Sequence, residues 1–415
     1  MRPQSIPINA TIVMVGTPAL HRTLQMADED FQRYFRVTAE FDTIMDRTNK
    51  NLMKYAAFVA ARCESDGLRP FHKTAVARII DHSSRLVDHQ EKLTTRFMDV
   101  ADLITEANYW AGVDGGDVVY DKHVKKAVDH KRYRSALTED RLQEFIEDGT
   151  IHIDTDSDAV GRINGLAVMS FGNYMFGKPS RITARVSLGR GQLVKVERES
   201  RLSGRIHDKG FTILTGYLNA KYGQDKQLSL NASIGFEQSY SEIDGDNASS
   251  TELYALLSAL SGLPIKQAFA VIGSVNQNGQ VQAIGGGTAK IEGYFDLCAT
   301  RGLTGEQSVM LPYNNVKNLV LKDEVRQAVT SGKFHIYGVH TIDESIEILT
   351  GIPAGEVDSD GIYPQGSVHW LVEKRLKYMA DAAKAFGKDD KPEDEKANEV
   401  GEKDQVDDRP EPELP

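Results

Sequence analysis

The spacing of apolar residues separates a helical first part of the chain from a second part in which strands and helices mix. Between residues 43 and 148, glycine and proline are scarce, and apolar residues recur at the spacing of one helix face. One such stripe consists of Ala75, Ile79, Leu86 and Val87. We predict helices over 72–87, 89–109, 118–130 and 138–147. The pattern indicates a small helical domain over 43–150.

From residue 150 onward, short apolar or alternating segments lie between glycine-rich turns, which is typical of strands. The strands expected first are 151–156, 159–169, 181–189, 192–199 and 210–218. After residue 246, predicted helices (248–260, 288–299, 322–330 and 342–350) alternate with predicted strands (268–275, 280–284, 307–311 and 333–338). We therefore expect a mixed α+β or α/β domain over about 157–355.

The two ends of the chain differ from these domains. Residues 11–16, TIVMVG, are β-branched and apolar, and they are predicted to form a buried strand. Because no partner strand is predicted near it, we expect this strand to be the last one of a domain whose earlier part is missing from the chain. A last helix is predicted over 366–386, and the acidic, proline-rich tail 387–415 is expected to be disordered.

Composition disfavours several classes of protein. Most of the net charge of −11 lies in residues 388–415, which hold 12 acidic and five basic side chains. The rest of the chain is nearly neutral, which disfavours a basic nucleic-acid-binding protein. The two cysteines, Cys63 and Cys298, are too few for a disulfide framework or a cysteine-based zinc site. With no apolar run of about 20 residues and no signal peptide, a cytoplasmic protein without a membrane span is expected.

The first candidate for chemistry is an acidic, glycine-containing turn that leads into a helix within 241–264. The helix is indicated by leucines at helical spacing: Leu253, Leu256, Leu257 and Leu260. Asn247 is predicted to cap it, and Ser249 with Glu252 could form an alternative capping box. The free backbone N–H groups and the positive dipole end of such a helix start are suited to stabilising an oxyanion.

The second candidate is Lys290, in a segment where a strand ends at three glycines and a helix begins near Thr288. In the first turn of a helix the dipole disfavours a cation, and an apolar site would lower the pKa of the ammonium group further. A lysine that is neutral enough to take a proton could act as a general base toward a serine hydroxyl. The alternative is a solvated surface charge.

Together, the two segments resemble the proteolytic domain of the Lon family of ATP-dependent proteases. In that family a nucleophilic serine lies in a turn at a helix start, and a lysine follows after a strand and a glycine turn. The pattern maps onto Gly245-Asp246-Asn247-Ala248, Pro264, Gly273, Gly279, Gly285-Gly286 and Lys290, and the likeness extends to 206–210, 236–240 and 290–298. The chain is most similar to a bacterial Lon-related group whose turn reads E-G-D-S-A-S-S.

The resemblance implies a domain order, a mechanism and an assembly. Residues 1–42 resemble the end of an AAA+ ATPase large subdomain, 43–150 its helical lid, and 157–355 the proteolytic domain. The family implies a serine endopeptidase with a Ser-Lys dyad: Lys290 is the base, position 247 the nucleophile, and the surrounding turn (Gly245, Asp246 and Ala248) serves the oxyanion. It also implies ATP and Mg²⁺, a hexameric ring, and unfolded or damaged proteins as substrates.

Four departures from the family pattern change that expectation. Asn247 stands at the position of the nucleophilic serine, and a carboxamide cannot attack a peptide carbonyl as an activated hydroxyl can. Ile272 replaces a threonine that many members carry beside the dyad. The chain has no G-x-x-x-x-G-K-[S/T] phosphate loop and no acidic Walker-B strand, so the ATP-binding half is expected to be absent and no cofactor is assigned. Thr105 stands where a nucleotide-sensing arginine of the lid is expected.

Other residues are weaker candidates. Ser249 points away from the direction of position 247, and Ser250 lies almost a turn further along, so neither is expected to replace the nucleophile. His207-Asp208 could be half of a catalytic pair, but a polar turn between strands explains it better. Four features are assigned no chemistry: the histidine pairs His82/His89 and His123/His130, the glycines 285–287, and the basic run over 120–134, interpreted as a solvated helix face.

Three hypotheses for function follow. The first is a Lon-type endopeptidase that is impaired by Asn247. The second is a non-catalytic pseudoprotease that assembles with or regulates an active Lon-type ring, or binds unfolded chains without cutting them. The third is a decayed or truncated gene product, or one whose ATPase half is encoded separately. The sequence favours an impaired protease.

Overall fold

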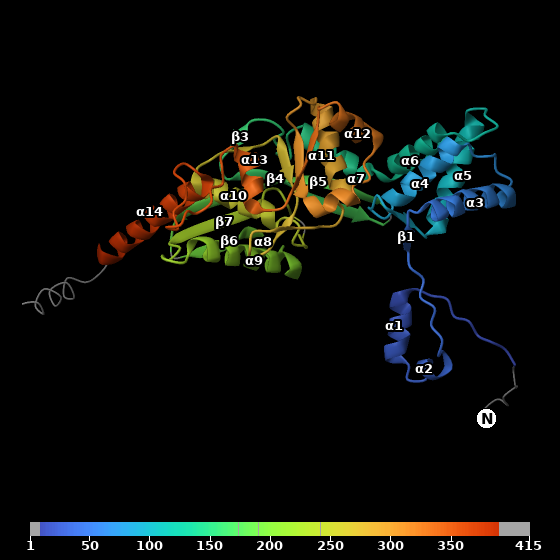
Figure 1. The fold of residues 1–415 in the computed structure, drawn as a ribbon, viewed down its shortest axis with the longest axis horizontal. Coiled ribbons are helices and arrows are strands. Elements are labelled where there is room, and N and C mark those ends of the chain that lie inside the picture. Colours follow the sequence, from blue (N-terminus) through green and yellow to red (C-terminus); the bar gives the residue numbers. More distant parts are fainter. Residues whose placement is uncertain (1–8, 173, 190, 241, 390–415) are drawn as a thin grey trace, which may run out of the picture.

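The computed structural model describes residues 9–172, 174–189, 191–240 and 242–389. Figure 1 shows a helical domain beside a sheet domain, with two short helices, α1 (Pro18–Ala27) and α2 (Phe31–Tyr34), standing apart from both. The helical domain consists of β1 (Ile44–Asp46), α3 (Asn49–Asp66), α4 (Lys73–Arg85), β2 (Lys92–Thr94), α5 (Phe97–Val113), α6 (Asp121–Ser135) and α7 (Leu137–Glu147).

The helical domain has its own apolar core. Helices α3 to α6 enclose fully buried side chains that include Tyr55, Ile79, Ile104 and Ala107. The stripe predicted over 72–87 is only partly correct. Ala75 and Ile79 are buried, but Leu86 is 41% exposed because α4 has already ended at Arg85.

The sheet domain is organised around one mixed sheet. Its strands, in the order in which they lie within the described residues, are β13 (His335–Val339), β12 (Ser308–Pro312), β9 (Phe269–Val271), β4 (Arg162–Phe171), β5 (Tyr174–Leu188), β7 (Leu230–Phe236) and β6 (Gln192–Lys195). β5 pairs antiparallel with both β4 and β7, and the other neighbours pair parallel. This arrangement confirms the mixed α/β fold class expected from the sequence.

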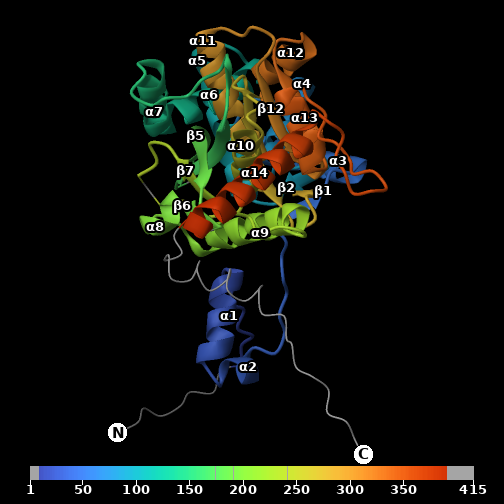
Figure 2. The ribbon, with the colours of Figure 1, turned by 90° about the vertical axis from the view of Figure 1, so that its left-hand side faces the viewer.

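Helices cover both faces of this sheet. On one face lie α9 (Arg205–Tyr222), α10 (Ser249–Ser261), α13 (Ile342–Thr350) and α14 (Val368–Asp389); on the other lie α11 (Gly287–Arg301) and α12 (Asp323–Thr330). Alternate residues of β9 belong to the two cores, Phe269 and Val271 to the first and Ala270 to the second. This alternation is the period-two pattern of a strand that is buried on both faces. Figure 2 shows α14 lying across α10 and close to α9.

Short elements complete the sheet domain. They are β3 (Asp158–Ala159), α8 (Val196–Glu199), β8 (Ile265–Lys266), β10 (Ser274–Val275), β11 (Val281–Gln282) and the 3₁₀-helix η1 (Tyr313–Asn318).

The helix α11 lies directly on β5, because each contributes a glycine where they meet. A Cβ atom on Gly177 would lie 2.4 Å from the carbonyl oxygen of Ala289, and one on Gly293 would lie 2.2 Å from the carbonyl oxygen of Gly177. Protein interiors are packed too densely for such contacts, so a side chain at either position would push the helix off the strand.

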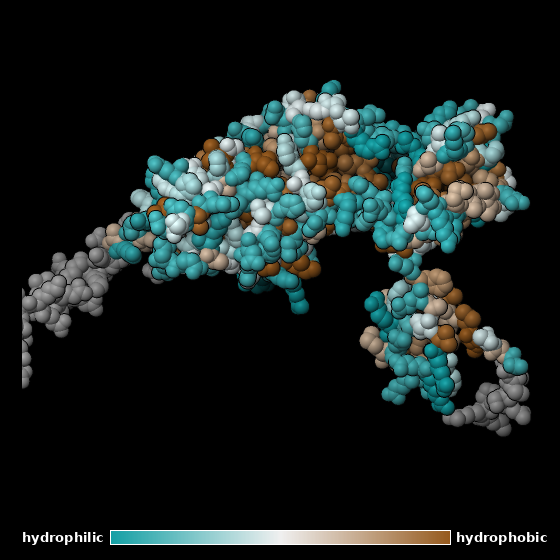
Figure 3. Space-filling view, in the orientation of Figure 1, coloured by the Kyte–Doolittle hydropathy of each residue, from teal (hydrophilic) through white to brown (hydrophobic). Residues whose placement is uncertain are grey.

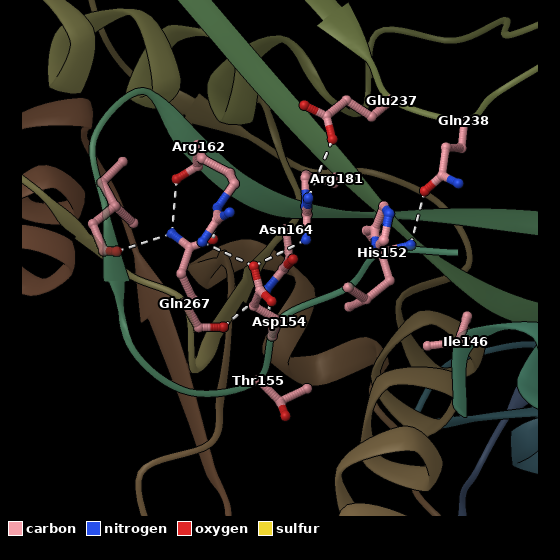
Figure 4. A network of polar contacts seen from close by, with 12 residues as sticks. Ile146, His152, Asp154, Thr155, Arg162, Asn164, Arg181, Glu237, Gln238 and Gln267 are labelled. Atoms are coloured by element: carbon pink, nitrogen blue, oxygen red, sulfur yellow. Dashed lines mark hydrogen bonds and ion pairs between the residues drawn. The ribbon is translucent and has the colours of Figure 1, made fainter. Parts of the chain in front are cut away.

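The segment that joins the two domains is fixed to the sheet domain by a polar network (Figure 4). Arg162 and Arg181 both pair with Asp154, at 2.9 and 3.0 Å, and Arg181 also reaches Glu237 at 3.4 Å. Asn164, on β4, donates a hydrogen bond to the Asp154 carbonyl at 2.7 Å. The end of the helical domain is therefore anchored to β4, β5 and the end of β7.

Several predicted elements are wrong. Residues 210–218 lie in α9 and not in a strand, because their buried side chains recur at helical spacing: Phe211, Leu214, Tyr217 and Leu218. Residues 151–156 lie in the connection between the domains. The range 89–109 is not one helix: it contains β2, which pairs with β1, and α5 begins only at Phe97. Short β-branched runs carry too little periodicity to distinguish a helix from a strand.

The ends of the chain also differ from expectation. Residues 11–16 form no strand with any described residue and are exposed, Val15 at 96%. Figure 3 shows apolar residues on the neighbouring α1–α2 segment, where Leu20 and Met26 are 53% and 83% exposed. The last helix runs to Asp389, three residues further than predicted, and the rest of the predicted disordered tail lies outside the described residues. None of the helices in the described ranges is long and apolar enough to cross a membrane.

The glycine contact between α11 and β5 can be tested by substitution. Gly293→Ala should lower the free energy of unfolding by about 2–3 kcal/mol, because the new methyl group overlaps the β5 backbone. The measurement is urea unfolding followed by circular dichroism. The control is Gly285→Ala, whose Cβ would meet no atom within 4 Å. Equal stability of both variants would show that the contact between α11 and β5 can accommodate an added methyl group.

Candidate active site

The turn before α10 is bonded to the segment that follows β9. The Gly273 N–H donates to the Asn247 carbonyl at 2.9 Å, and the Ser250 N–H donates to the Gly273 carbonyl at 3.3 Å. One residue earlier, the Ile272 N–H donates to the Met310 carbonyl of β12 at 3.0 Å. The position of Asn247 is therefore set by main-chain bonds that lead into the sheet.

The predicted side-chain caps of this helix are not formed. α10 begins at Ser249, its N-cap is Ala248, and no side chain caps it. Asn247 lies one position too early to be the N-cap. The capping box of Ser249 and Glu252 is absent because both side chains have other partners, described below.

The two serines next to position 247 hold the turn together. The Ser249 hydroxyl donates to the Asp246 carbonyl at 3.0 Å and accepts from the Val275 N–H at 3.1 Å. The Ser250 hydroxyl donates to the Gly273 carbonyl at 2.8 Å. Both residues are buried. Because each hydroxyl proton is already given to a carbonyl, neither serine is placed to act as a nucleophile.

Asn247 itself is half-buried, and its side chain turns back toward Gly245. Its Nδ2 atom lies 3.7 Å from the point that a Cβ on Gly245 would occupy. Among the described residues, no acceptor takes a hydrogen bond from the backbone N–H of Asn247 or of Ala248. Two unpaired N–H groups at a helix start form the kind of site that stabilises an oxyanion.

Lys290 is fully buried, contrary to the alternative of a solvated surface charge. It lies in the first turn of α11, where its N–H donates to the Gly286 carbonyl at 3.2 Å. Among the described residues, its Nζ atom has no hydrogen-bond partner. Burial lowers the pKa of Lys290 to about 8, and the opposing negative charge is that of Asp246. The pKa therefore moves in the direction expected from the sequence, and the charge of Asp246 acts on the amine from the turn before α10.

Apolar and glycine residues complete the surroundings of Lys290. Ile272 is buried in the same apolar cluster as Ile291, so position 272 offers the amine no hydrogen bond. Gly286, the N-cap of α11, has a φ of +69°, and a Cβ there would lie 2.7 Å from Cγ2 of Val168 on β4. Glycine is therefore required both for the left-handed backbone and for the close approach to β4.

A buried polar cluster behind the 245–248 turn was missed from the sequence. Lys195 Nζ lies 3.0 Å from Glu252 Oε1, and both side chains are inaccessible to solvent. His207 Nε2 lies 3.7 Å from the same oxygen, and His207 Nδ1 lies 3.2 Å from the Gly245 carbonyl. The cluster joins β6, α9 and α10 to the turn. The available signal was a charged residue among the core-facing leucines of the 248–260 helix.

The ionisation of this cluster follows from its burial. Burial raises the pKa of Glu252 to about 7, although the charge of Lys195 opposes the shift. Burial and the charge of Lys195 lower the pKa of His207 to about 4. His207 is therefore neutral at physiological pH, and its Nδ1–H can donate to the Gly245 carbonyl. This places His207 in the first turn of α9, as a support for the turn and not in a polar turn between strands.

The remaining candidates carry no visible site. The described residues contain no group of three or more histidine, cysteine, aspartate or glutamate side chains that could hold a metal ion. Thr105 donates within α5 to the Ala101 carbonyl at 3.0 Å. The basic run over 120–134 is not simply a solvated face, because Lys125 pairs with Glu324 at 2.7 Å and Arg132 with Asp296, also at 2.7 Å.

The chain contains one run that resembles part of a phosphate loop. Its one G-x-x-x-x-G-K run, residues 172–178, is followed by Pro179 in place of serine or threonine. In the structure, residues 174–178 of this run lie in β5, and the run does not precede a helix. A phosphate loop needs a helix start and a hydroxyl for Mg²⁺, and this run supplies neither.

Comparison with known families gives three matches along the chain. Residues 136–351 match the Lon protease (S16) C-terminal proteolytic domain. Residues 70–134 match the archaeal LonB AAA+ ATPase lid domain, and residues 1–42 match the LonB-like AAA domain.

Similar proteins occur in bacteria and archaea. Two carry the name "Putative Lon protease homolog". The one from Escherichia coli (strain K12) is 32% identical over 84% of this chain and 59% of its own length, and the one from Haemophilus influenzae is 40% identical over 56% and 39%. An archaeal Lon protease of Archaeoglobus fulgidus is 30% identical over 74% of this chain and 46% of its own length. The chain thus spans about half the length of these curated relatives.

The unpaired burial of Lys290 predicts that its removal stabilises the fold. Lys290→Met should raise the free energy of unfolding at pH 7 by about 3 kcal/mol, the equivalent of a pKa that falls from 10.5 to about 8. Below pH 8 the folded chain must bury a charged amine. Between pH 8 and 10.5 the unfolded chain holds more protons, so native stability rises with pH and most of the gain should be gone at pH 10.

The matched control is the other fully buried lysine. Lys195→Met should lower the free energy of unfolding at pH 7 by about 3 kcal/mol, because Glu252 loses its buried partner. Guanidinium unfolding at pH 7 and pH 10 measures both variants. Destabilisation by Lys290→Met at pH 7 would contradict the unpaired state of its amine.

Proposed function

Because the chain belongs to the Lon protease family, we propose that its sheet domain is a Lon-type proteolytic domain that holds polypeptides without efficient cleavage. The observation that carries this proposal is the combination of a buried, unpaired Lys290 with a carboxamide at position 247. The base of a Ser-Lys dyad is present, and its nucleophile is absent.

The chemistry of the site follows from these two residues. With a pKa of about 8, a substantial fraction of Lys290 is neutral near pH 7.5 and could accept a proton from a hydroxyl. A serine at 247 would then attack a peptide carbonyl, the C–N bond would break, and the amine product would leave with the proton held by Lys290. Water would hydrolyse the remaining acyl-enzyme and free the serine. The amide of Asn247 has no proton whose removal gives such a nucleophile, and Ser249 and Ser250 are committed to the turn.

The free edge of β4 supports an extended polypeptide as the ligand. Within the described residues, β4 pairs with β9 only at Asn164 and Gly165, so the edge of 166–171 that faces away from β5 is unpaired. This edge passes the turn before Lys290, because Val168 contacts Gly286. An unfolded chain can add to such an edge as a further strand. Its main chain would form hydrogen bonds with β4, and this kind of binding depends little on the sequence of the bound chain.

A second candidate is a non-catalytic partner of an active Lon-type ring. It is favoured by the same Asn247, because the scaffold of the turn is complete without a nucleophile. We propose assembly in a ring, hexameric as the family resemblance implies, either with copies of this chain or with an active paralogue. ATP-dependence would then come from chains that carry the nucleotide site. The two unpaired cysteines, Cys63 and Cys298, are consistent with a proposed cytoplasmic location.

Restoring the nucleophile tests the proposal. Asn247→Ser should create hydrolysis of a fluorogenic peptide, and Lys290→Ala in that background should lower the rate by about 10²-fold or more, because the serine loses its base. The native chain and Asn247→Ala should both be inactive. Measurable turnover by the native chain that Lys290→Ala abolishes would show that another group serves as nucleophile and would overturn the proposal.

A further inference from the structure

The helical domain, called the lid from here on because its residues 70–134 match a LonB lid domain, contacts the helix that carries Lys290. Arg85, the last residue of α4, donates to both carboxylate oxygens of Glu292 on α11, to Oε1 at 2.6 Å. The same guanidinium donates to the Val320 carbonyl at 2.9 Å. The Lys322 N–H donates to Glu292 Oε1 at 2.7 Å, so that the carboxylate joins the lid, α11 and the start of α12.

A second set of contacts runs from the lid to the turn before α11. The Gln90 N–H donates to the Lys317 carbonyl at 3.0 Å, and its side chain donates to the Leu319 carbonyl at 2.9 Å. Within the same segment, Asn315 accepts from the Ile284 N–H at 2.9 Å and donates to the Ile284 carbonyl at 2.7 Å. The end of α4 is therefore connected, through η1, to the glycine turn from which α11 starts.

The interface around these contacts is polar and partly hollow. The lid and the sheet domain have separate large apolar cores, and a small apolar cluster joins them where Ile146 of α7 packs with Leu297 of α11. A cavity of about 330 Å³ lies between them, lined by residues of α6, α7, β5 and α11 that include Arg132 and Asp296. Polar interfaces of this kind allow two domains to move relative to one another. A shift at the end of α4 can thus break the Arg85 contacts without opening either large core, while the apolar cluster of Ile146 and Leu297 stays in place.

The geometry of α11 connects such a shift to Lys290. Residues 290 and 292 are two positions apart on a helix, about 200° around its axis, so Glu292 meets the lid while Lys290 lies on the opposite side. Gly293, next to Glu292, holds the helix against β5. The helix α11 is therefore held from two sides, by β5 at Gly293 and by the lid at Glu292.

We propose that Arg85 is a positioning residue for Lys290, holding the first turn of α11 through Glu292 so that displacement of the lid changes the burial and reactivity of the amine. The consequence for peptide hydrolysis rests on the proposed function, whereas the state of the amine does not. Burial is the main cause of the low pKa of Lys290, with Asp246 opposing it, so loosening the helix should admit water and raise that pKa.

The test is a titration of the Lys290 amine in the full chain. Lysine labelled with ¹³C at Cε gives one NMR signal per lysine, and Lys290→Met identifies the signal of interest. Arg85→Ala should raise the pKa of Lys290 by about one unit, so that the neutral fraction near pH 7 falls about tenfold. Arg85→Lys should restore part of the shift, because lysine keeps the charge without the two-pronged contact.

Two further variants separate positioning from general stability. Arg78→Ala removes another ion pair of the same interface, Arg78–Asp323 at 2.8 Å, which leads to α12 and not to α11. It should leave the titration of Lys290 unchanged even if the melting temperature falls. Combining Arg85→Ala with Glu292→Gln should shift the pKa no further than either change alone, because both break one contact.

The outcomes decide the proposal without reference to peptidase activity. An unchanged titration in Arg85→Ala, or an equal shift in Arg78→Ala, would overturn it. If Arg85→Ala does not fold, Glu292→Gln alone gives the same reading. Failure of Asn247→Ser to hydrolyse peptide would count against the proposed function only, because the titration needs no turnover.

Discussion

The contact of α11 with β5 is the constraint on which the site depends. Two backbones can approach this closely only where both residues lack a side chain, and Gly177 and Gly293 meet that condition. The contact fixes the start of α11 against β5, and Gly286, seven residues before Gly293, also lies close to β4. Lys290 is consequently held inside the domain, where a more distant helix would leave its amine in water.

Two fully buried lysines among the described residues differ in their surroundings. Lys195 lies 3.0 Å from Glu252 and belongs to a buried cluster that supports the turn from behind. Lys290 has no such partner among the described residues, so the fold bears the cost of its desolvation. Unpaired, desolvated amines are typical of sites that exchange protons, whereas paired ones are typical of structure. The fold thus keeps a buried amine without a partner at a position where stability alone would select an apolar residue.

The sequence was a good guide where periodicity was long or motifs were dense. The predicted helices 248–260, 288–299 and 342–350 agree with α10, α11 and α13 to within two residues at each end. The segments that contain Asn247 and Lys290 were correctly predicted to lie at the starts of two of these helices. It failed where short β-branched runs were ambiguous, as in α9, and where a strand pairs with a distant partner, as in β2.

The interactions between domains could not have been predicted in the same way. Arg85 and Glu292 are 207 residues apart, and the basic run over 120–134 looks like a solvated surface until its acidic partners are placed opposite it. The buried Lys195–Glu252 pair is equally non-local. Charge pairs of this kind depend on the tertiary arrangement, which local propensity does not encode.

The structure of the turn around position 247 affects how easily this residue can change in evolution. Its shape is set by main-chain bonds of Gly273 and by the hydroxyls of Ser249 and Ser250, and the side chain of Asn247 takes no part in them. Substitution of the residue at 247 is therefore expected to change the free energy of unfolding very little. The asparagine codons AAU and AAC differ by one nucleotide from the serine codons AGU and AGC, so serine could arise at position 247 in one mutation without passing through an unfolded intermediate.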